Sequence, residues 1–274
     1  MNAFKHLLKT AGSHPPVGTW ILSADPLVAE AIGHAGFEWG VLDMEHAPAD
    51  MMDVVHLLQA VTSTRMVPVV RVPWNDPVTV KRVLDAGATS VMFPFIESAD
   101  QAQRAVAATR YPPRGVRGVV GMSRASRFGT NLQYLTHADE GLCTIVQIET
   151  PDAAERAEAI TTVDGVDAVF VGPADLSAAM GHIAHPAHPQ VLDLMSRIVQ
   201  RCKRAGVPVG TVGGTPDAVA QYRAIGFDFV AVGSDLGLMM RGAMNALSAL
   251  KTQDVDIVHS VTVGTLTGAT SHGS

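Results

Sequence analysis

Ionisable residues that could do chemistry together follow several short apolar runs of the chain. His46 stands just after the run that ends at Asp43, Arg71 ends the next run, and Glu149 and Asp175 follow two later ones. An imidazole titrates near neutral pH and therefore suits a general base. A guanidinium offers a planar fork of donors to an oxyanion, and two carboxylates can share a divalent cation while leaving positions for substrate oxygens. Together these residue types suggest enolate chemistry.

The positions of the lysines argue against enolate formation through a Schiff base. None of them follows an apolar run, since they stand at Lys5, Lys9, Lys81, Lys203 and Lys251. An aldolase that forms a Schiff base would therefore lack its nucleophile. If a carbonyl is activated here, a metal ion must do it.

The elements that would position these groups are eight predicted strands. Five follow a glycine that ends a helix-like segment, as in "DAGATSVMFP" and "VDGVDAVFVG", which is the helix-to-strand half of a βα unit. The other three are "VGTWIL", "VPVVRV" and "CTIVQIE". Helical segments between them begin with an Asp-Pro pair at Asp25-Pro26 and again at Asp76-Pro77.

Eight such units predict an α/β protein, a single-domain (β/α)8 TIM barrel over residues 1–252. Residues 253–274 are small and polar towards their end, and we expect a mobile C-terminal tail there. An open doubly wound sheet is the alternative, although no GxGxxG follows the first strand. In a barrel the carboxyl ends of the strands meet at one rim. The residues named above would meet there, whereas each alone could be an ordinary solvated rim residue.

Composition limits the classes of partner. Of 274 residues, 47 % are hydrophobic and 17 % charged, which allows a sizeable core. The net charge of −6 gives no reason to expect nucleic acid or an anionic membrane, and no apolar run approaches the roughly 18 residues of a membrane span. Cys143 and Cys202 lie far apart and form no CxxC, so we expect a reducing cytoplasm.

Five ordered motifs carry a resemblance to a known family. They are "VLDMEHAP", "PVVRVPWNDP", "RYPPRGVRGV", "VQIET" and "VFVGPADLSAAMG". In these motifs the chain resembles the HpcH/HpaI family of metal-dependent (class II) pyruvate aldolases, from about residue 17 to 240. The resemblance implies that Glu149 and Asp175 bind Mg2+, Mn2+ or Co2+ and that His46 is the base.

The resemblance also implies roles for other residues. Asp85 would support the basicity of His46, and Arg71 would stabilise the developing enolate. Gln147 and the backbone at Ala174 and Asp175 would contact the keto acid.

The activity implied is reversible cleavage of a 4-hydroxy-2-oxo acid to pyruvate and an aldehyde through a pyruvate enolate held by the metal and Arg71. A homo-oligomer is implied as well, and a hexamer with C-terminal helices exchanged between subunits is the arrangement suggested. Two alternatives stay open: a citrate-lyase-like enzyme acting on acyl-CoA thioesters, and a catalytically silent metabolite-binding barrel. Arg117, Arg124 and Arg127 could hold an acidic acceptor or make surface or subunit contacts.

Overall fold

A computed structural model describes the backbone of residues 1–267 and the side chains of residues 1–251. The chain divides into two compact units, Met1–Asp235 and Leu236–Ser274. The first unit contains every strand of the described residues, and the predicted site residues belong to it.

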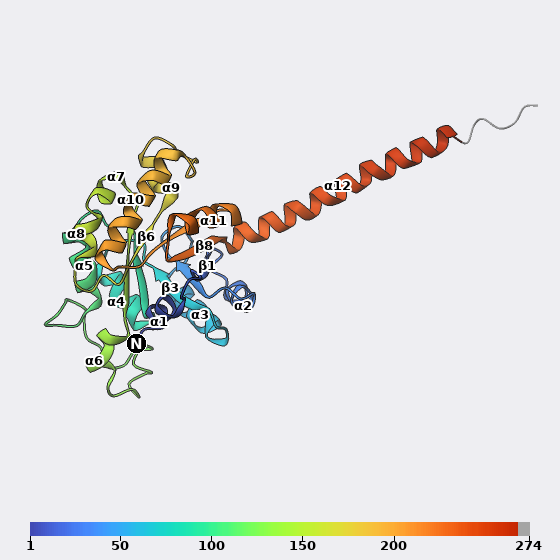
Figure 1. The fold of residues 1–274 in the computed structure, drawn as a ribbon. Coiled ribbons are helices and arrows are strands. Elements are labelled where there is room, and N and C mark those ends of the chain that lie inside the picture. The colour runs from blue at the N-terminus through green and yellow to red at the C-terminus, as the bar shows by residue number, and fades with distance from the viewer. Residues whose placement is uncertain (268–274) are drawn as a thin grey trace, which may run out of the picture. The chain divides into compact units, whose positions relative to one another are not determined.

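The first unit is a closed barrel of eight strands in the order β1 to β8, every neighbouring pair being parallel (Figure 1). The strands are β1 (Val17–Ile21), β2 (Trp39–Asp43), β3 (Val67–Arg71), β4 (Ser90–Phe93), β5 (Cys143–Ile148), β6 (Ala168–Val171), β7 (Val209–Gly213) and β8 (Phe229–Ser234). The predicted TIM barrel is confirmed. Because β1 pairs with β8, the open-sheet alternative is wrong.

Helices surround the strands, as the alternation in the sequence predicts (Figure 1). They are α1 (Ala3–Thr10), α2 (Pro26–His34), α3 (Met51–Ala60), α4 (Pro77–Asp85), α5 (Ala99–Thr109), α6 (Tyr134–His137), α7 (Pro151–Glu155), α8 (Ala157–Thr161), α9 (Pro173–Ala179), α10 (Pro189–Ala205) and α11 (Pro216–Ile225), with 3-10 turns η1 (Val61–Ser63) and η2 (Ala138–Gly141). The Asp25 and Asp76 side chains cap α2 and α4 by accepting backbone N–H bonds, and a proline follows each cap. Both predicted helix starts are confirmed.

The barrel interior is filled by large aromatic side chains. Trp39, Phe170 and Phe229 pack against one another edge-on or tilted, with ring centroids 5.5 to 6.4 Å apart. Two strand glycines make room for them, since a Cβ on Gly18 would lie 2.3 Å from the Trp39 ring and one on Gly210 would lie 2.2 Å from the Phe229 ring. The interior is therefore a packed core, and the site must lie at a rim.

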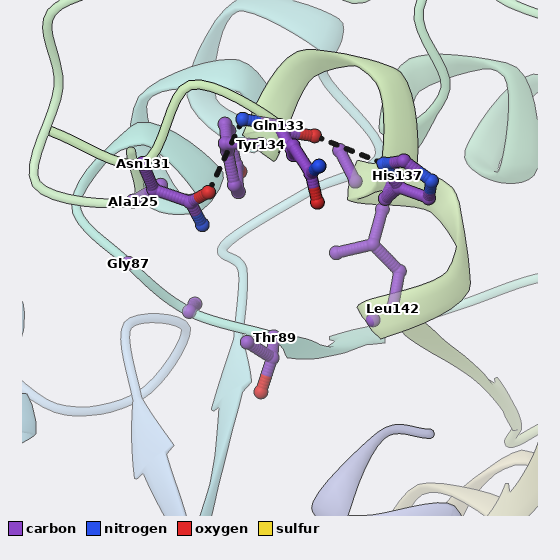
Figure 2. A pocket seen from close by; sticks show the side chains of 11 residues that line it. Gly87, Thr89, Ala125, Asn131, Gln133, Tyr134, His137 and Leu142 are labelled. Carbon is purple, nitrogen blue, oxygen red and sulfur yellow. Dashed lines mark hydrogen bonds between the residues drawn. The ribbon is translucent and has the colours of Figure 1, made fainter. Parts of the chain in front are cut away.

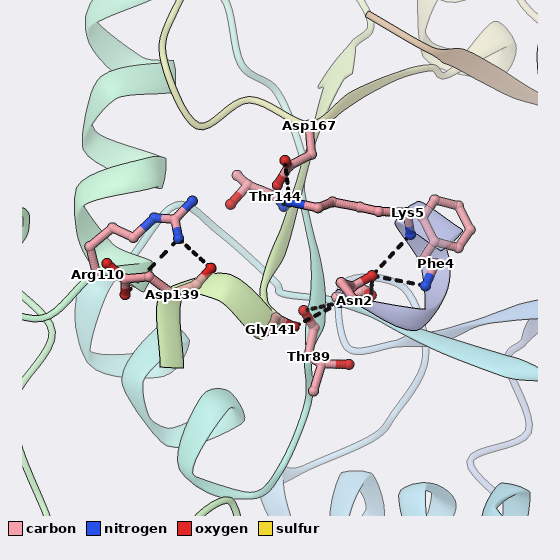
Figure 3. Close-up of polar contacts among 10 residues, drawn as sticks. Asn2, Phe4, Lys5, Thr89, Arg110, Asp139, Gly141, Thr144 and Asp167 are labelled. Atoms are coloured by element: carbon pink, nitrogen blue, oxygen red, sulfur yellow. Dashed lines mark hydrogen bonds and ion pairs between the residues drawn. The ribbon is translucent and has the colours of Figure 1, made fainter. Parts of the chain in front are cut away.

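The amino end of the barrel is closed by α1. The Asn2 side chain accepts from the N–H groups of Phe4 and Lys5 and donates to the carbonyls of Thr89 and Gly141, as Figure 3 shows. Phe4 is fully buried against the Trp39 and Phe229 rings, and Lys5 Nζ pairs with an Asp167 oxygen at 2.8 Å. These contacts leave the carboxyl ends of the strands as the open rim.

The second unit is described by its helix, α12 (Asp235–Thr267). The predicted division between residues 252 and 253 falls within this helix, and the last part of the predicted tail, residues 268–274, lies outside the described residues. Among the helices of residues 1–267, none is long and apolar enough to cross a membrane.

Candidate active site

Polar side chains gather at the carboxyl ends of β2, β3, β5 and β6. In the β2–β3 register Asp43 lies beside Arg71, and in the β5–β6 register Ile148 lies beside Val171. The latter pairing brings Glu149, one residue beyond β5, next to Gly172, one residue beyond β6. The barrel therefore brings the predicted residues Arg71, Glu149 and Asp175 to one rim.

Asp43 and Arg71 form a buried ion pair at this rim. Arg71 donates from Nε and Nη2 to the two Asp43 oxygens, both at 2.7 Å. The same carboxylate accepts the backbone N–H groups of Glu45 at 3.0 Å and of His46 at 3.4 Å. One carboxylate thus orients the guanidinium and the loop that carries the predicted base. Sequence reasoning gave Asp43 no role, and the β2–β3 register is the signal that would have found it.

Glu45 is a second acidic neighbour of the guanidinium. Its Oε2 lies 2.7 Å from Arg71 Nη1, and its Oε1 lies 3.9 Å from His46 Nε2. Burial raises the pKa of the Glu45 carboxyl, although the Arg71 charge opposes the rise. The His46 side chain itself is 62 % exposed. Within one chain, Glu45 is therefore the carboxylate that lies beside the predicted base.

The face of the Arg71 guanidinium lies over an aromatic ring. Its Cζ is 4.2 Å from the centroid of the Trp20 ring at the end of β1. A buried cation over an indole face gains electrostatic stabilisation. Together with Asp43, this contact fixes the plane of the guanidinium.

Glu149 is almost fully buried at the end of β5. It accepts the Phe95 N–H at 3.1 Å and the Gln147 Nε2 at 2.9 Å. Burial raises the pKa of Glu149 to about 7, and the nearby Asp175 and Glu45 carboxylates add to the rise. The Gln147 side chain is buried as well, and its Oε1 has no hydrogen-bond partner among the described residues.

Gly172 explains how the β6 loop approaches Glu149. A Cβ on Gly172 would lie 2.2 Å from Glu149 Oε1, so only glycine lets the backbone come this close. Pro173 then occupies the first position of α9, and Asp175 lies in its first turn. The Gly-Pro pair after β6 thus places an acidic side chain close enough to the Glu149 carboxyl to raise its pKa.

This donor set fits a divalent cation bound by two carboxylates. A cation would relieve the mutual repulsion of Glu149 and Asp175 and would lower the raised pKa of Glu149. Among the described residues, no three His, Cys, Asp or Glu side chains form a ready-made metal cluster. Most of the positions around the cation would therefore belong to water or substrate oxygens, as hard cations allow.

The structure does not bring Asp85 to this rim within one chain. It ends α4, which runs from the carboxyl end of β3 back towards the amino end of β4. There its carboxylate pairs with the buried Arg117 at 2.8 Å. Arg124 donates to the Ala86 carbonyl, and the Arg127 side chain is exposed. The first two arginines thus hold the segment between α5 and β5 onto α4.

A cavity of about 270 Å³ lies near the same segment (Figure 2). Gly87, Thr89 and Leu142 line it, and these residues precede β4 and β5. The cavity is therefore at the amino ends of the strands, opposite the carboxylate rim. It is a separate feature from the candidate site.

The lysines of the described side chains all lie in helices. Lys5 and Lys9 belong to α1, and Lys81, Lys203 and Lys251 belong to α4, α10 and α12. No amine among the described residues therefore stands at a strand end to form an imine.

The model of the HpcH/HpaI aldolase/citrate lyase family matches residues 17–242. The chain belongs to this family. Among its curated relatives, 2-dehydro-3,6-dideoxy-6-sulfogluconate aldolase of Pseudomonas putida is 50 % identical over 86 % of this chain and 92 % of its own length. The 4-hydroxy-2-oxo-heptane-1,7-dioate aldolase of Salmonella dublin is 44 % identical over 90 % of this chain and 94 % of its own.

A solved member of the same family supports the fold. The structure of an HpcH/HpaI aldolase/citrate lyase family protein from Burkholderia cenocepacia J2315 is 42 % identical, covers 92 % of this chain and 100 % of its own, and has a TM-score of 0.88. With relatives of this similarity named as aldolases, this member of the HpcH/HpaI family is an enzyme of the aldolase type, a carbon–carbon lyase.

Proposed function

We propose that the enzyme cleaves a 4-hydroxy-2-oxo acid to pyruvate and an aldehyde at the rim formed by Arg71, Glu149 and Asp175. The observation that carries this proposal is the buried Glu149 carboxyl, with its raised pKa, beside Asp175 and close to the oriented Arg71 guanidinium. A cation held by Glu149 and Asp175 would polarise the substrate carbonyl and offset the charge of the enolate. We propose Mg2+, Mn2+ or Co2+ in this place.

The remaining roles belong to the chain's own side chains. His46 would remove the proton of the C4 hydroxyl, and its exposure leaves the imidazole open to substrate or to a bridging water. Arg71 would donate hydrogen bonds to the enolate that forms as the C3–C4 bond breaks. Gln147, whose Oε1 is buried without a partner among the described residues, and the backbone at Ala174 and Asp175 would contact the keto acid.

Asp85 can support His46 only if a second copy of the chain contributes it, because it lies at the other end of its own barrel. We therefore propose a homo-oligomer, with the hexamer and exchanged C-terminal helices as its form. Exposed apolar side chains along α12 support a subunit interface: Met239, Met240, Met244, Leu247 and Leu250. The two free, buried cysteines support a reducing cytoplasmic setting.

The experiment that tests the activity is a substrate panel. Purified enzyme with Mn2+ is given the sulfonated and carboxylated 4-hydroxy-2-oxo acids for which its relatives are named, and pyruvate release is followed. We expect pyruvate from at least one of them. Cleavage of malyl- or citryl-CoA without cleavage of any free acid would favour the acyl-CoA alternative, and no turnover at all would favour the silent barrel.

Replacing Gly172 by alanine is expected to weaken Mn2+ binding, because the new Cβ would displace the Glu149 carboxyl. The loss should approach that of Asp175→Asn, which removes one of the two ligand charges. Both variants should stay folded, since the rim adds little to the core. Calorimetric titration with Mn2+ measures the effect. Gly121→Ala is the matched control, because nothing lies within 4 Å of its added Cβ. An unchanged Mn2+ affinity in Gly172→Ala would contradict the metal assignment.

Metal binding is expected to strengthen as the pH rises to about 7. The pKa of Glu149 is raised to about 7, so below that pH the carboxyl holds a proton that the cation must displace. One displaced proton weakens binding about tenfold for each pH unit below the pKa. Titrations with Mn2+ at pH 6 and pH 8 test this, together with the proton released into weak buffer. The dependence should vanish in Glu149→Gln, whereas its persistence there would assign the proton to another group.

A further inference from the structure

The two acidic partners of Arg71 differ in how firmly they hold it. Asp43 is buried, binds Nε and Nη2 at 2.7 Å, and is itself fixed by the backbone N–H groups of Glu45 and His46. These bonds tie Asp43 to the guanidinium and to the backbone of its own loop. Asp43 is therefore the better-oriented acidic partner of the guanidinium.

Glu45 makes a contact of a different geometry with the guanidinium. Its Oε2 lies 2.7 Å from Nη1 but has no well-directed hydrogen bond among the described residues, although the atom is buried. Its Oε1 lies 3.9 Å from His46 Nε2. The contact is therefore a charge attraction without good hydrogen-bond geometry, unlike the bidentate pair with Asp43.

Glu45 lies on the part of the Arg71 guanidinium that Asp43 leaves free. Asp43 already takes the Nε and Nη2 donors, which leaves Nη1 as the nitrogen that Asp43 does not bind. An enolate or carboxylate oxygen stabilised by Arg71 can accept from the two N–H groups of Nη1 and from the second N–H of Nη2. Glu45 Oε2 lies 2.7 Å from Nη1.

We propose that Glu45 is a positioning residue that competes with the anionic oxygen of the keto acid for Nη1 of Arg71 and is displaced when the keto acid binds. This inference rests on the proposed function, because it takes Arg71 to bind the keto acid. Each binding event replaces the Glu45 carboxylate on Nη1 by an oxygen of the keto acid, so Glu45 opposes substrate binding and favours release of pyruvate. The displaced carboxylate stays within reach of the His46 imidazole.

Removal of the Glu45 charge is therefore expected to tighten binding of the enolate analogue. The probe is oxalate, a planar dianion that resembles the pyruvate enolate, titrated by calorimetry into protein saturated with Mn2+. In Glu45→Gln the dissociation constant should fall about tenfold, the effect of losing one partly buried competing charge. The constant for inhibition by pyruvate and the KM for the cleaved acid should fall by a similar factor, while kcat should not rise.

Two further variants make the test specific. Glu140→Gln, a charge removal at an exposed residue of η2, should leave oxalate binding unchanged. Glu45→Asp withdraws the carboxylate by one methylene and should tighten binding by about threefold, an intermediate gain. If Glu45→Gln does not fold, Glu45→Asp decides the question in the same way.

The proposal would be overturned if Glu45→Gln bound oxalate no more tightly than the wild type while keeping its melting temperature and Mn2+ affinity. Glu45 would then not compete with the keto acid for Arg71. A lower kcat with unchanged KM would likewise show that Glu45 only supports Arg71 structurally. A different result would show that the proposed function is wrong. In that case oxalate would not bind to the wild-type protein in the presence of Mn2+. That result would overturn both proposals.

Discussion

Replacing His46 by alanine is expected to slow aldol cleavage by about 10²–10⁴-fold and to slow oxaloacetate decarboxylation much less. Aldol cleavage must remove a hydroxyl proton, and loss of the general base removes that step. Decarboxylation reaches the same pyruvate enolate by losing CO2 and has no hydroxyl to deprotonate. The exposed imidazole contributes little to the fold, so the variant should stay stable.

The measurement is the pair of rates at saturating Mn2+, corrected for decarboxylation by free metal. His56→Ala serves as the control, since His56 is exposed on α3 away from the strand ends. Equal losses in both reactions would show that His46 positions the cation or the keto acid. The base would then have to be sought elsewhere.

Replacing Arg71 by alanine is expected to impair both reactions, by about 10²–10³-fold in kcat, because both develop the charge of an enolate. The substitution also leaves the buried Asp43 carboxylate without its guanidinium partner. A comparison with Arg71→Lys separates the two effects, because a lysine keeps the charge but loses the bidentate fork.

Circular dichroism and the melting temperature show whether the Arg71 variants remain folded, and Arg82→Ala on the exposed face of α4 is the matched control. We expect Arg71→Lys to recover stability more than activity. A folded Arg71→Ala protein that retains either reaction at the wild-type rate would remove Arg71 from the proposed mechanism.

The fold was open to prediction because its signals are local and repeated. A glycine at a helix end, followed at once by an apolar run, recurs along the chain, and the Asp-Pro pairs at 25–26 and 76–77 start helices as expected. The role of α1 was not predictable from such signals. It depends on Asn2 reaching Thr89 and Gly141, residues far away in the sequence.

The sequence predicts the site residues that directly follow strands, but not the contacts between them. Arg71, Glu149 and Asp175 meet at one rim because parallel strands end together. The pairing of Asp43 with Arg71 depends on the register between β2 and β3, which the hydrophobic pattern does not specify. The contact of Glu45 with Arg71 depends on how the loop after β2 folds back, which is a tertiary property.

Asp85 shows the limit of reasoning from motifs. Its place in "VLDAG" matches the resemblance, but a residue at the end of a helix lies at the amino end of the barrel. The direction of α4 therefore separates Asp85 from His46 within one chain. There the Asp85 carboxylate forms an ion pair with Arg117 instead. A role in catalysis requires a neighbouring subunit.

The central claim is that an enolate forms at a carboxylate-bound cation and not on a lysine, and one measurement tests it most directly. The enzyme is stripped with EDTA, assayed for cleavage of its best 4-hydroxy-2-oxo acid, and then assayed again after addition of Mn2+ or Mg2+. In parallel, enzyme and pyruvate are treated with borohydride and the intact mass is measured. We predict that EDTA abolishes cleavage, that the added cation restores it, and that the protein mass is unchanged. Cleavage that survives EDTA together with a trapped pyruvate adduct on a lysine would contradict the account.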